Sequence, residues 1–285
     1  MPASPEMFRA LGALCERPDP AHAGLAAAVA LPPPPGPASF TEVFVLQLVP
    51  YAAPYLSPDG MLGGETADRV AGFWRALSLT PPAEPDHLAA LLGLYAALSE
   101  QEQAEHEPAR RAACRDARRA LLWEHLLTWA PTYTQAIITL SSRFHAAWAR
   151  LLREALLDEA QALEPPPTPP LHLRDVADLP DSTSDAFVPA ILAPARSGLL
   201  LTRRDLAGAA TATGMGTRIG GRAFILRALI SQDRAATFRW LARRAAWWAA
   251  RHRAGDPPLA GITPHWYGKA EATRRLLHQT LLEAA

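Results

Sequence analysis

Two short stretches of the chain hold the side chains that are best suited to chemistry. Residues 84–88 read Glu-Pro-Asp-His-Leu, and residues 125–129 begin with His-Leu and end with Trp. Carboxylates pair with guanidinium and ammonium groups through charge-assisted hydrogen bonds, and an imidazole titrates close to neutral pH. The two stretches are therefore the first candidates for a functional site.

Each stretch also has a structural interpretation. Asp86 precedes a leucine-rich segment, where a carboxylate can cap the free amides of a first helical turn and complement the helix dipole. His125 lies at helical spacing from Leu121 and Trp129, and a lone histidine on an apolar face is more often a core residue with satisfied hydrogen bonds. The structural interpretation is sound for Asp86 and weaker for His87.

The sequence shows none of the familiar catalytic, metal-binding or nucleotide-binding patterns. The two cysteines, Cys15 and Cys114, form no CxxC pair, and the nine histidines show no HxxH or HxxxH spacing. No GxSxG elbow is present. The glycines of residues 214–221 loosely resemble a phosphate-binding loop, but a helical segment precedes them and no GK[ST] follows. We expect no catalysis, no metal ion and no cofactor.

Composition and periodicity place these stretches in an all-α protein. Of the 285 residues, 49% are hydrophobic, and the strong helix formers Ala and Leu supply much of that fraction. Apolar residues recur at helical spacing, most clearly after Pro85, and prolines fall mostly between the periodic segments. The residues expected to share one core are Leu88, Leu91, Leu92, Tyr95, Leu122, Leu126, Phe144, Trp148 and Leu151.

Capping residues and prolines predict several helix boundaries. Ser4, which precedes a proline, predicts the start of a first helix. Thr202 and Asp205 have the spacing of a capping box for a later helix. Pro131 opens a helix that is expected to run without a break to about residue 163.

The sequence Glu-Pro-Pro-Pro-Thr-Pro-Pro at residues 164–170 is the best candidate for a domain boundary. Successive prolines fix φ and remove helical hydrogen-bond donors. We therefore predict an all-helical domain of residues 1–163, a proline-rich linker of residues 164–186 and a helical extension of residues 187–285. Residues 1–165 hold 12 Lys/Arg and 19 Asp/Glu, whereas residues 166–285 hold 16 and 9, so the extension is basic.

Two interpretations of the basic extension stay open. Residues 201–229 read as helix, glycine-containing turn and helix, an outline shared by helix-turn-helix DNA readers and by any pair of neighbouring helices. The zero formal net charge of the whole chain argues against strong phosphate binding, so we do not expect nucleic acid as a partner. Opposite charge instead predicts that residues 187–285 dock on the acidic front domain, with arginines facing the carboxylates of residues 100–107.

The sequence carries no recognisable targeting segment. Its first 20 residues lack the basic start and the uninterrupted apolar run of a signal peptide. No segment approaches the roughly 20 apolar residues of a membrane span. We expect a cytoplasmic protein.

Together, residues 84–88 and 125–129 resemble the TorD/DmsD/NarJ family of redox-enzyme maturation chaperones. That family is recognised by an acidic-Pro-Asp-His-Leu junction before a leucine-rich helix and by a later His-Leu…Trp pattern. A Pro-Tyr pair at Pro54 and an aromatic pair at Phe73 are also similar to the family. The resemblance covers about residues 1–160.

The resemblance implies a helical bundle of the TorD type with an additional C-terminal helical region. It implies a chaperone, not an enzyme, that binds an apo molybdopterin oxidoreductase, often through its twin-arginine signal peptide, until the cofactor is inserted. Such a signal has two guanidinium groups and then an apolar stretch, so its receptor needs carboxylates beside a hydrophobic groove. We expect a monomer or homodimer; the alternative is a DNA-binding regulator that uses residues 201–229. The expected client-binding residues are Tyr51, Phe73, Trp74, Glu84, Pro85, Asp86, His87, His125 and Trp129.

Overall fold

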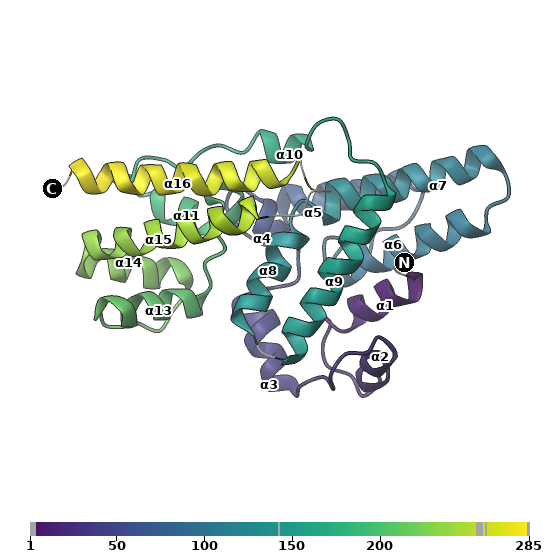
Figure 1. Cartoon of the computed structure of the whole chain (residues 1–285), viewed down its shortest axis with the longest axis horizontal. Coiled ribbons are helices and arrows are strands. Elements are labelled where there is room, and N and C mark those ends of the chain that lie inside the picture. The colour runs from purple at the N-terminus through teal and green to yellow at the C-terminus, as the bar shows by residue number, and fades with distance from the viewer. Residues whose placement is uncertain (1–3, 142, 255–258, 260, 284–285) are drawn as a thin grey trace. The chain divides into compact units, whose positions relative to one another are not determined.

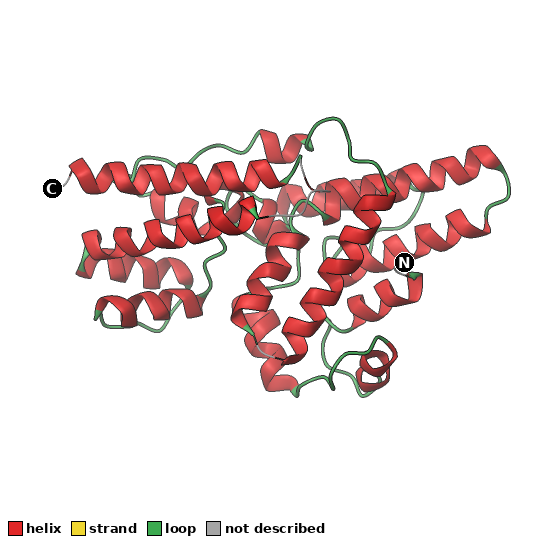
Figure 2. Cartoon of the chain, viewed as in Figure 1, coloured by secondary structure: helices red, strands yellow, loops and turns green. Residues whose placement is uncertain are grey.

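The computed structural model describes residues 4–141, 143–254, 259 and 261–283 (Figure 1). Within these residues all regular structure is helical (Figure 2), and the β-type pairing is limited to an isolated antiparallel bridge between Tyr51 and His87. The predicted all-α fold is confirmed. The chain forms two compact units: unit 1 comprises Met1–Ala53 and Leu62–Pro170, and unit 2 comprises Pro54–Met61 and Leu171–Ala285.

Unit 1 is a helical bundle. Its elements, in chain order, are α1 (Pro5–Ala13), α2 (His22–Ala28), α3 (Pro37–Phe40), η1 (Thr41–Gln47), α5 (Gly64–Ala76), α6 (Leu88–Ala104), α7 (Pro108–Ala120), η2 (Leu121–Leu126), α8 (Ala130–Leu140) and α9 (Arg143–Ala162). α6 packs against both α1 and α7, and α8 packs against α9 (Figure 1). η1 and η2 are π-helices closed by i→i−5 hydrogen bonds, such as the 2.8 Å bond from Leu127 N–H to the carbonyl of Leu122.

The core of unit 1 forms where the predicted apolar positions meet. Eight of the nine predicted core residues are buried, whereas Leu151 is half-buried and its neighbour Leu152 takes the fully buried position. The start of α1 is also as predicted, because Ser4 Oγ accepts a hydrogen bond from Met7 N–H. Trp148 Nε1 then ties α9 to the far end of α1 by donating to the carbonyl of Leu11 at 2.9 Å.

The prediction of a single helix from Pro131 to about residue 163 is wrong. α8 ends at Leu140, Ser141 is extended, and α9 begins at Arg143 with a φ of 46°. The last two residues of α8 and its C-cap read Thr-Leu-Ser, and the Thr139 hydroxyl donates back to a carbonyl four residues earlier at 2.9 Å. Such side chains compete for helical backbone groups and weaken the helix there. The chain reverses direction, and α8 and α9 form a hairpin.

The carboxylates of residues 100–107 have partners inside unit 1. Glu100 pairs with Arg9, and Glu102 lies 3.2 Å from a guanidinium nitrogen of Arg118. Glu107, the N-cap of α7, pairs with Arg110 in the first turn of that helix. The charge distribution predicted arginines of residues 187–285 as their partners. The partners found for Glu100, Glu102 and Glu107 are arginines of unit 1 instead.

The proline-rich residues 164–170 close unit 1 instead of starting a free linker. The guanidinium of Arg119 donates to the carbonyls of Glu164 and Pro165 at 2.6 and 3.2 Å, and Trp123 Nε1 donates to the carbonyl of Leu163 at 2.9 Å. Prolines lack a donor but keep their carbonyl acceptors, so such a segment can still be held by side-chain donors. The rest of the predicted linker, residues 171–186, lies in unit 2.

Unit 2 combines two long paired helices with several short ones. Its elements are α4 (Ala53–Leu56), which starts at the last residue of unit 1 before the crossover, α10 (Leu171–Arg174), α11 (Phe187–Leu192), α12 (Pro194–Ser197), α13 (Arg203–Thr213), α14 (Arg222–Gln232), α15 (Arg234–Arg253) and α16 (Thr263–Glu283). α15 and α16 run alongside each other, and α13 and α14 pack on α15 (Figure 1). The predicted capping box is present, with Thr202 Oγ1 accepting from Asp205 N–H at 3.1 Å.

Residues 54–61 join unit 2 although they are distant from it in sequence. Gly60 has a φ of 67° and lies so close to the residue that follows α11 that an added Cβ would be 3.2 Å from the Cα of Ala193. Tyr55 and Leu56 are buried, and Tyr55 interacts electrostatically with Arg222. The short segment is therefore an integral part of the second unit. Among the described residues, none of the helices has the length and hydrophobicity needed to cross a membrane.

Candidate functional site

The junction before α6 is held to an earlier loop by backbone pairing. Leu88 N–H donates to the carbonyl of Pro50 at 2.8 Å, and Ala52 N–H donates to the carbonyl of Asp86 at 3.0 Å. The carboxylate of Asp86 accepts a third hydrogen bond from the backbone N–H of Ala53 at 3.0 Å. Three hydrogen bonds thus fix the acidic-Pro-Asp-His stretch at the start of the helix.

His87, not Asp86, is the N-cap of α6. Its Nδ1 accepts a hydrogen bond from the backbone N–H of Ala89 at 3.1 Å. The predicted capping role of Asp86 is wrong, because its side chain is directed to the loop and is only 3% exposed. A neutral imidazole is required for Nδ1 to accept. Burial lowers the pKa of His87 and so favours that neutral form.

The two carboxylates of the junction, Asp86 and Glu84, differ in their exposure to solvent. Burial raises the pKa of Asp86, and the hydrogen bond from Ala53 opposes that rise. Glu84 is exposed. Burial, followed by a hydrogen bond with Glu84, raises the pKa of Tyr51 to about 12, and the Tyr51 ring lies edge-on to the His87 ring at 4.7 Å. Glu84 is therefore the carboxylate of the junction that a ligand can meet, whereas Asp86 serves the protein's own backbone.

Glu16 is an acidic neighbour of the junction that sequence reasoning missed. It follows α1, which packs tightly on α6: a Cβ added to Gly12 would lie 3.2 Å from the Cα of Ala89. Glu16 and Glu84 both act electrostatically to raise the pKa of His87, against the larger effect of burial. Glu16 is distant in sequence and carries no motif, so only the packing of α1 on α6 reveals it.

A second group of predicted residues surrounds His125 in η2. The rings of Phe73 and His125 lie 4.9 Å apart, and Trp129 Nε1 donates to the carbonyl of His125 at 2.8 Å. Burial, together with the nearby charge of Arg69, lowers the pKa of His125 to about 4. His125 is therefore neutral at physiological pH, and the expectation that it responds to pH near neutrality is wrong.

Two buried N–H donors on α5 lack partners in the described part of the chain. They are Nε of Arg69 and Nε1 of Trp74. A buried donor without an acceptor costs roughly 1–3 kcal/mol, so a ligand or water that supplies an acceptor is favoured there. Arg69 lies one helical turn before Phe73 and was not predicted, although the i, i+4 spacing to Phe73 was available in the sequence.

These contacts arrange the nine predicted residues in two groups. Tyr51, Glu84, Pro85, Asp86 and His87 form the junction, and Phe73, His125 and Trp129 surround η2, with Trp74 on the same helix as Phe73. In the described parts of the chain, no set of three or more His, Cys, Asp or Glu side chains could hold a metal ion. The arrangement offers exposed carboxylates, aromatic surface and unmatched donors, which suit the binding of a polypeptide.

Comparison with known proteins gives one family. Residues 37–135 match the family model described as nitrate reductase delta subunit. This stretch is about a third of the chain and contains all nine predicted site residues. Searches of curated proteins and of solved structures gave no match.

Proposed function

We propose that the chain is a maturation chaperone for a molybdoenzyme, of the kind that the nitrate reductase delta subunit model matched by residues 37–135 describes, and that it holds an apo molybdopterin oxidoreductase subunit until the cofactor is inserted. The observation that carries this proposal is that the matched stretch contains both groups of the candidate site. The proposed role is binding without catalysis, in the cytoplasm.

The chemistry of the site supports a peptide-like client. Glu84 and Glu16 are exposed and both act electrostatically on the half-buried imidazole of His87, so a cationic side chain beside the junction would gain charge-assisted hydrogen bonds. The unmatched N–H groups of Arg69 and Trp74 would donate hydrogen bonds to backbone carbonyls of a bound segment. We propose that the segment is the N-terminal part of the oxidoreductase, including a twin-arginine signal where the client has one. The comparisons give no support to the DNA-binding alternative.

Co-purification tests this proposal. A tagged full-length chain is co-expressed with the catalytic subunit of a nitrate reductase in cells that cannot make the molybdenum cofactor, and the retained subunit is quantified. Glu84→Gln should reduce retention at least about fivefold, a loss of about 1 kcal/mol. Asp68→Asn, which removes an exposed carboxylate from α5, is the matched control and should retain the subunit. Failure of the unmodified chain to retain any apo subunit would contradict the proposal.

A further inference from the structure

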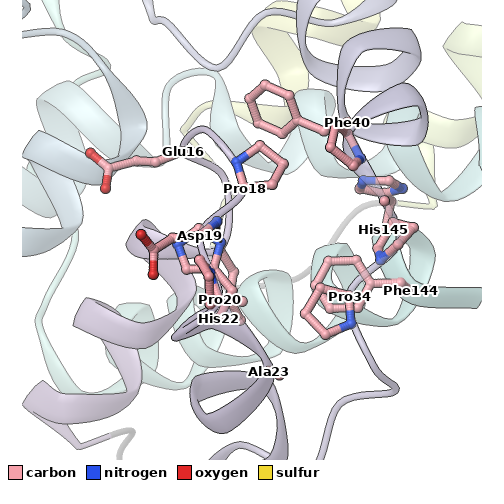
Figure 3. A pocket seen from close by; sticks show the side chains of 14 residues that line it. Glu16, Pro18, Asp19, Pro20, His22, Ala23, Pro34, Phe40, Phe144 and His145 are labelled. Carbon is pink, nitrogen blue, oxygen red and sulfur yellow. Dashed lines mark hydrogen bonds between the residues drawn. The ribbon is translucent and has the colours of Figure 1, made fainter.

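A cavity of about 290 Å³ opens in unit 1 beside the end of α1 (Figure 3). Its walls come from the loop between α1 and α2, the proline-rich segment before α3, and the start of α9. All of its lining residues lie outside the nine predicted site residues. Apart from Glu16, which also acts electrostatically on His87, the cavity shares no residue with the candidate site, and we treat it as a second place at which the molecule can take up a ligand.

The charges that line the cavity are of one sign. Among the described residues that line it, Glu16 and Asp19 are the charged ones, and both are exposed. Figure 3 shows these two carboxylates on one side of the cavity and the rings of Phe40, Phe144 and His145 on the other. With no lysine or arginine in its lining, the cavity disfavours phosphates and carboxylates and favours a cation at its acidic side.

The walls are apolar and rigid. Five of the lining residues are prolines, and two are phenylalanines. Proline fixes its own φ, so little backbone entropy is lost when a ligand fills the space between such walls. A volume of about 290 Å³ is at the lower end of ligand pockets. It suits one large apolar side chain, not an extended cofactor.

A histidine of α9 also lines the cavity. His145 is only 3% exposed, and its ring lies edge-on to Phe44 and Phe144 at 5.1 and 5.4 Å. Its Nδ1 is 3.4 Å from Ser141 Oγ, whereas Nε2 has no hydrogen-bond partner within the described part of the chain. Burial lowers the pKa of His145 to about 4, so this nitrogen belongs to a neutral ring. Nε2 can therefore hydrogen-bond a backbone amide group of a ligand.

We propose that the cavity binds an extended peptide segment in which a large apolar side chain stands next to an arginine or lysine. The apolar side chain fills the space between the prolines and the two phenylalanines. The cation pairs with Glu16 and Asp19, and the backbone of the segment meets His145 Nε2. This binding follows from the lining of the cavity and holds whether or not the client is a molybdoenzyme.

Fluorescence anisotropy with short synthetic peptides tests the proposal on the full chain. The probe is fluorescein-labelled Gly-Gly-Leu-Arg-Gly-Gly, compared with versions in which Leu is replaced by Gly or Arg by Glu. The Leu-Arg peptide should bind at least about tenfold more tightly than either control peptide, which corresponds to about 1.4 kcal/mol. Equal binding of the three peptides, or tighter binding of the Glu version, would overturn the proposal.

Variants of the two cavity carboxylates test whether the peptide binds in the cavity. The double variant Glu16→Gln, Asp19→Asn should lower the affinity for the Leu-Arg peptide at least about fivefold. It should also reduce the salt dependence of that affinity. Asn keeps the side-chain oxygen that accepts from Ala21 N–H at 2.8 Å, so the loop should keep its shape. The matched control, Asp68→Asn with Glu154→Gln, removes two exposed carboxylates outside the cavity and should bind as the unmodified chain does. Equal affinities for both double variants would place the peptide elsewhere and refute the assignment.

Discussion

The carboxylate of Asp86 and the backbone N–H of Ala53 lie 3.0 Å apart, in a buried hydrogen bond that spans 33 residues of sequence. Asp86 is 3% exposed, and Ala53 is fully buried. The next residue, Pro54, is the first of the segment that belongs to unit 2. The bond therefore anchors the chain at the point where it leaves unit 1.

Removing this acceptor should destabilise the protein. In Asp86→Ala the buried N–H of Ala53 is left without its acceptor, and we expect a loss of about 1–3 kcal/mol in the free energy of unfolding. Asp86→Asn keeps an oxygen acceptor and removes a charge that burial disfavours, so its stability should stay within about 1 kcal/mol of the unmodified chain. Urea denaturation followed by circular dichroism gives both values. Equal stability of the alanine variant would show that the bond contributes nothing.

The capping role of His87 predicts a different pattern of substitutions. His87→Ala removes the acceptor for Ala89 N–H and should cost about 0.5–2 kcal/mol. His87→Ser should recover most of that loss, because a serine hydroxyl accepts from the same turn. Thermal unfolding of the three proteins at one pH makes the comparison. A serine variant no more stable than the alanine variant would show that the ring packing against Tyr51, not the cap, is what matters.

Buried histidines should make the protein less stable in acid. Burial lowers the pKa of His125, His145 and His265 to about 4, whereas an unfolded histidine titrates near 6.5. Between these pH values the unfolded state binds more protons than the folded state, so the free energy of unfolding falls as the pH is lowered from 6.5 toward 4. His125 alone should account for about 2 kcal/mol at pH 5.

Urea midpoints at pH 7.5 and pH 5 check this effect. His125→Gln should show a smaller loss between the two pH values than the unmodified chain. His278→Gln, in which an exposed histidine of α16 is replaced, is the control and should keep the full loss. If the His125 variant lost as much stability as the control, the acid sensitivity would have another origin.

Two glycines of unit 2 should respond in opposite directions to the same substitution. Gly198 has a φ of 72°, and a Cβ there would lie 2.3 Å from the backbone nitrogen of Ala270 in α16. Gly198→Ala should therefore destabilise unit 2 by several kcal/mol, through left-handed strain and the clash together. Gly208 is inside α13 with open space around it, so Gly208→Ala should stabilise by about 0.5–1 kcal/mol. Hydrogen exchange of α16 amides would separate the two outcomes.

Sequence patterns predicted the local features well. The cap at Ser4 and the capping box at Thr202 depend on residues three positions apart, and both are present. The apolar stripe of α6 is equally local, and all of its predicted core residues are buried. Features of this kind depend on residues that are close in sequence, so periodicity and capping rules predict them.

Features that depend on contacts between distant parts of the chain could not be predicted from the sequence. The cap at His87 instead of Asp86 depends on the direction in which the loop around Ala53 approaches. Glu16 and Arg69 enter the site only because α1 packs on α6 and because α5 meets η2. The assignment of residues 54–61 to unit 2 is likewise a long-range contact that no local pattern encodes.

The crossover at residues 54–61 has a consequence for the order of synthesis. Leu171 follows Met61 by about 110 residues, which a ribosome takes roughly 5–20 s to translate. Throughout that interval Tyr55 and Leu56 have been made, but the helices that complete their unit have not. A nascent chain stopped after residue 170 would contain the whole stretch that the family model matches, and it would still expose the apolar side chains of residues 54–61. The nascent chain of this proposed chaperone thus exposes apolar surface for several seconds, and we expect it to need protection by other chaperones during synthesis.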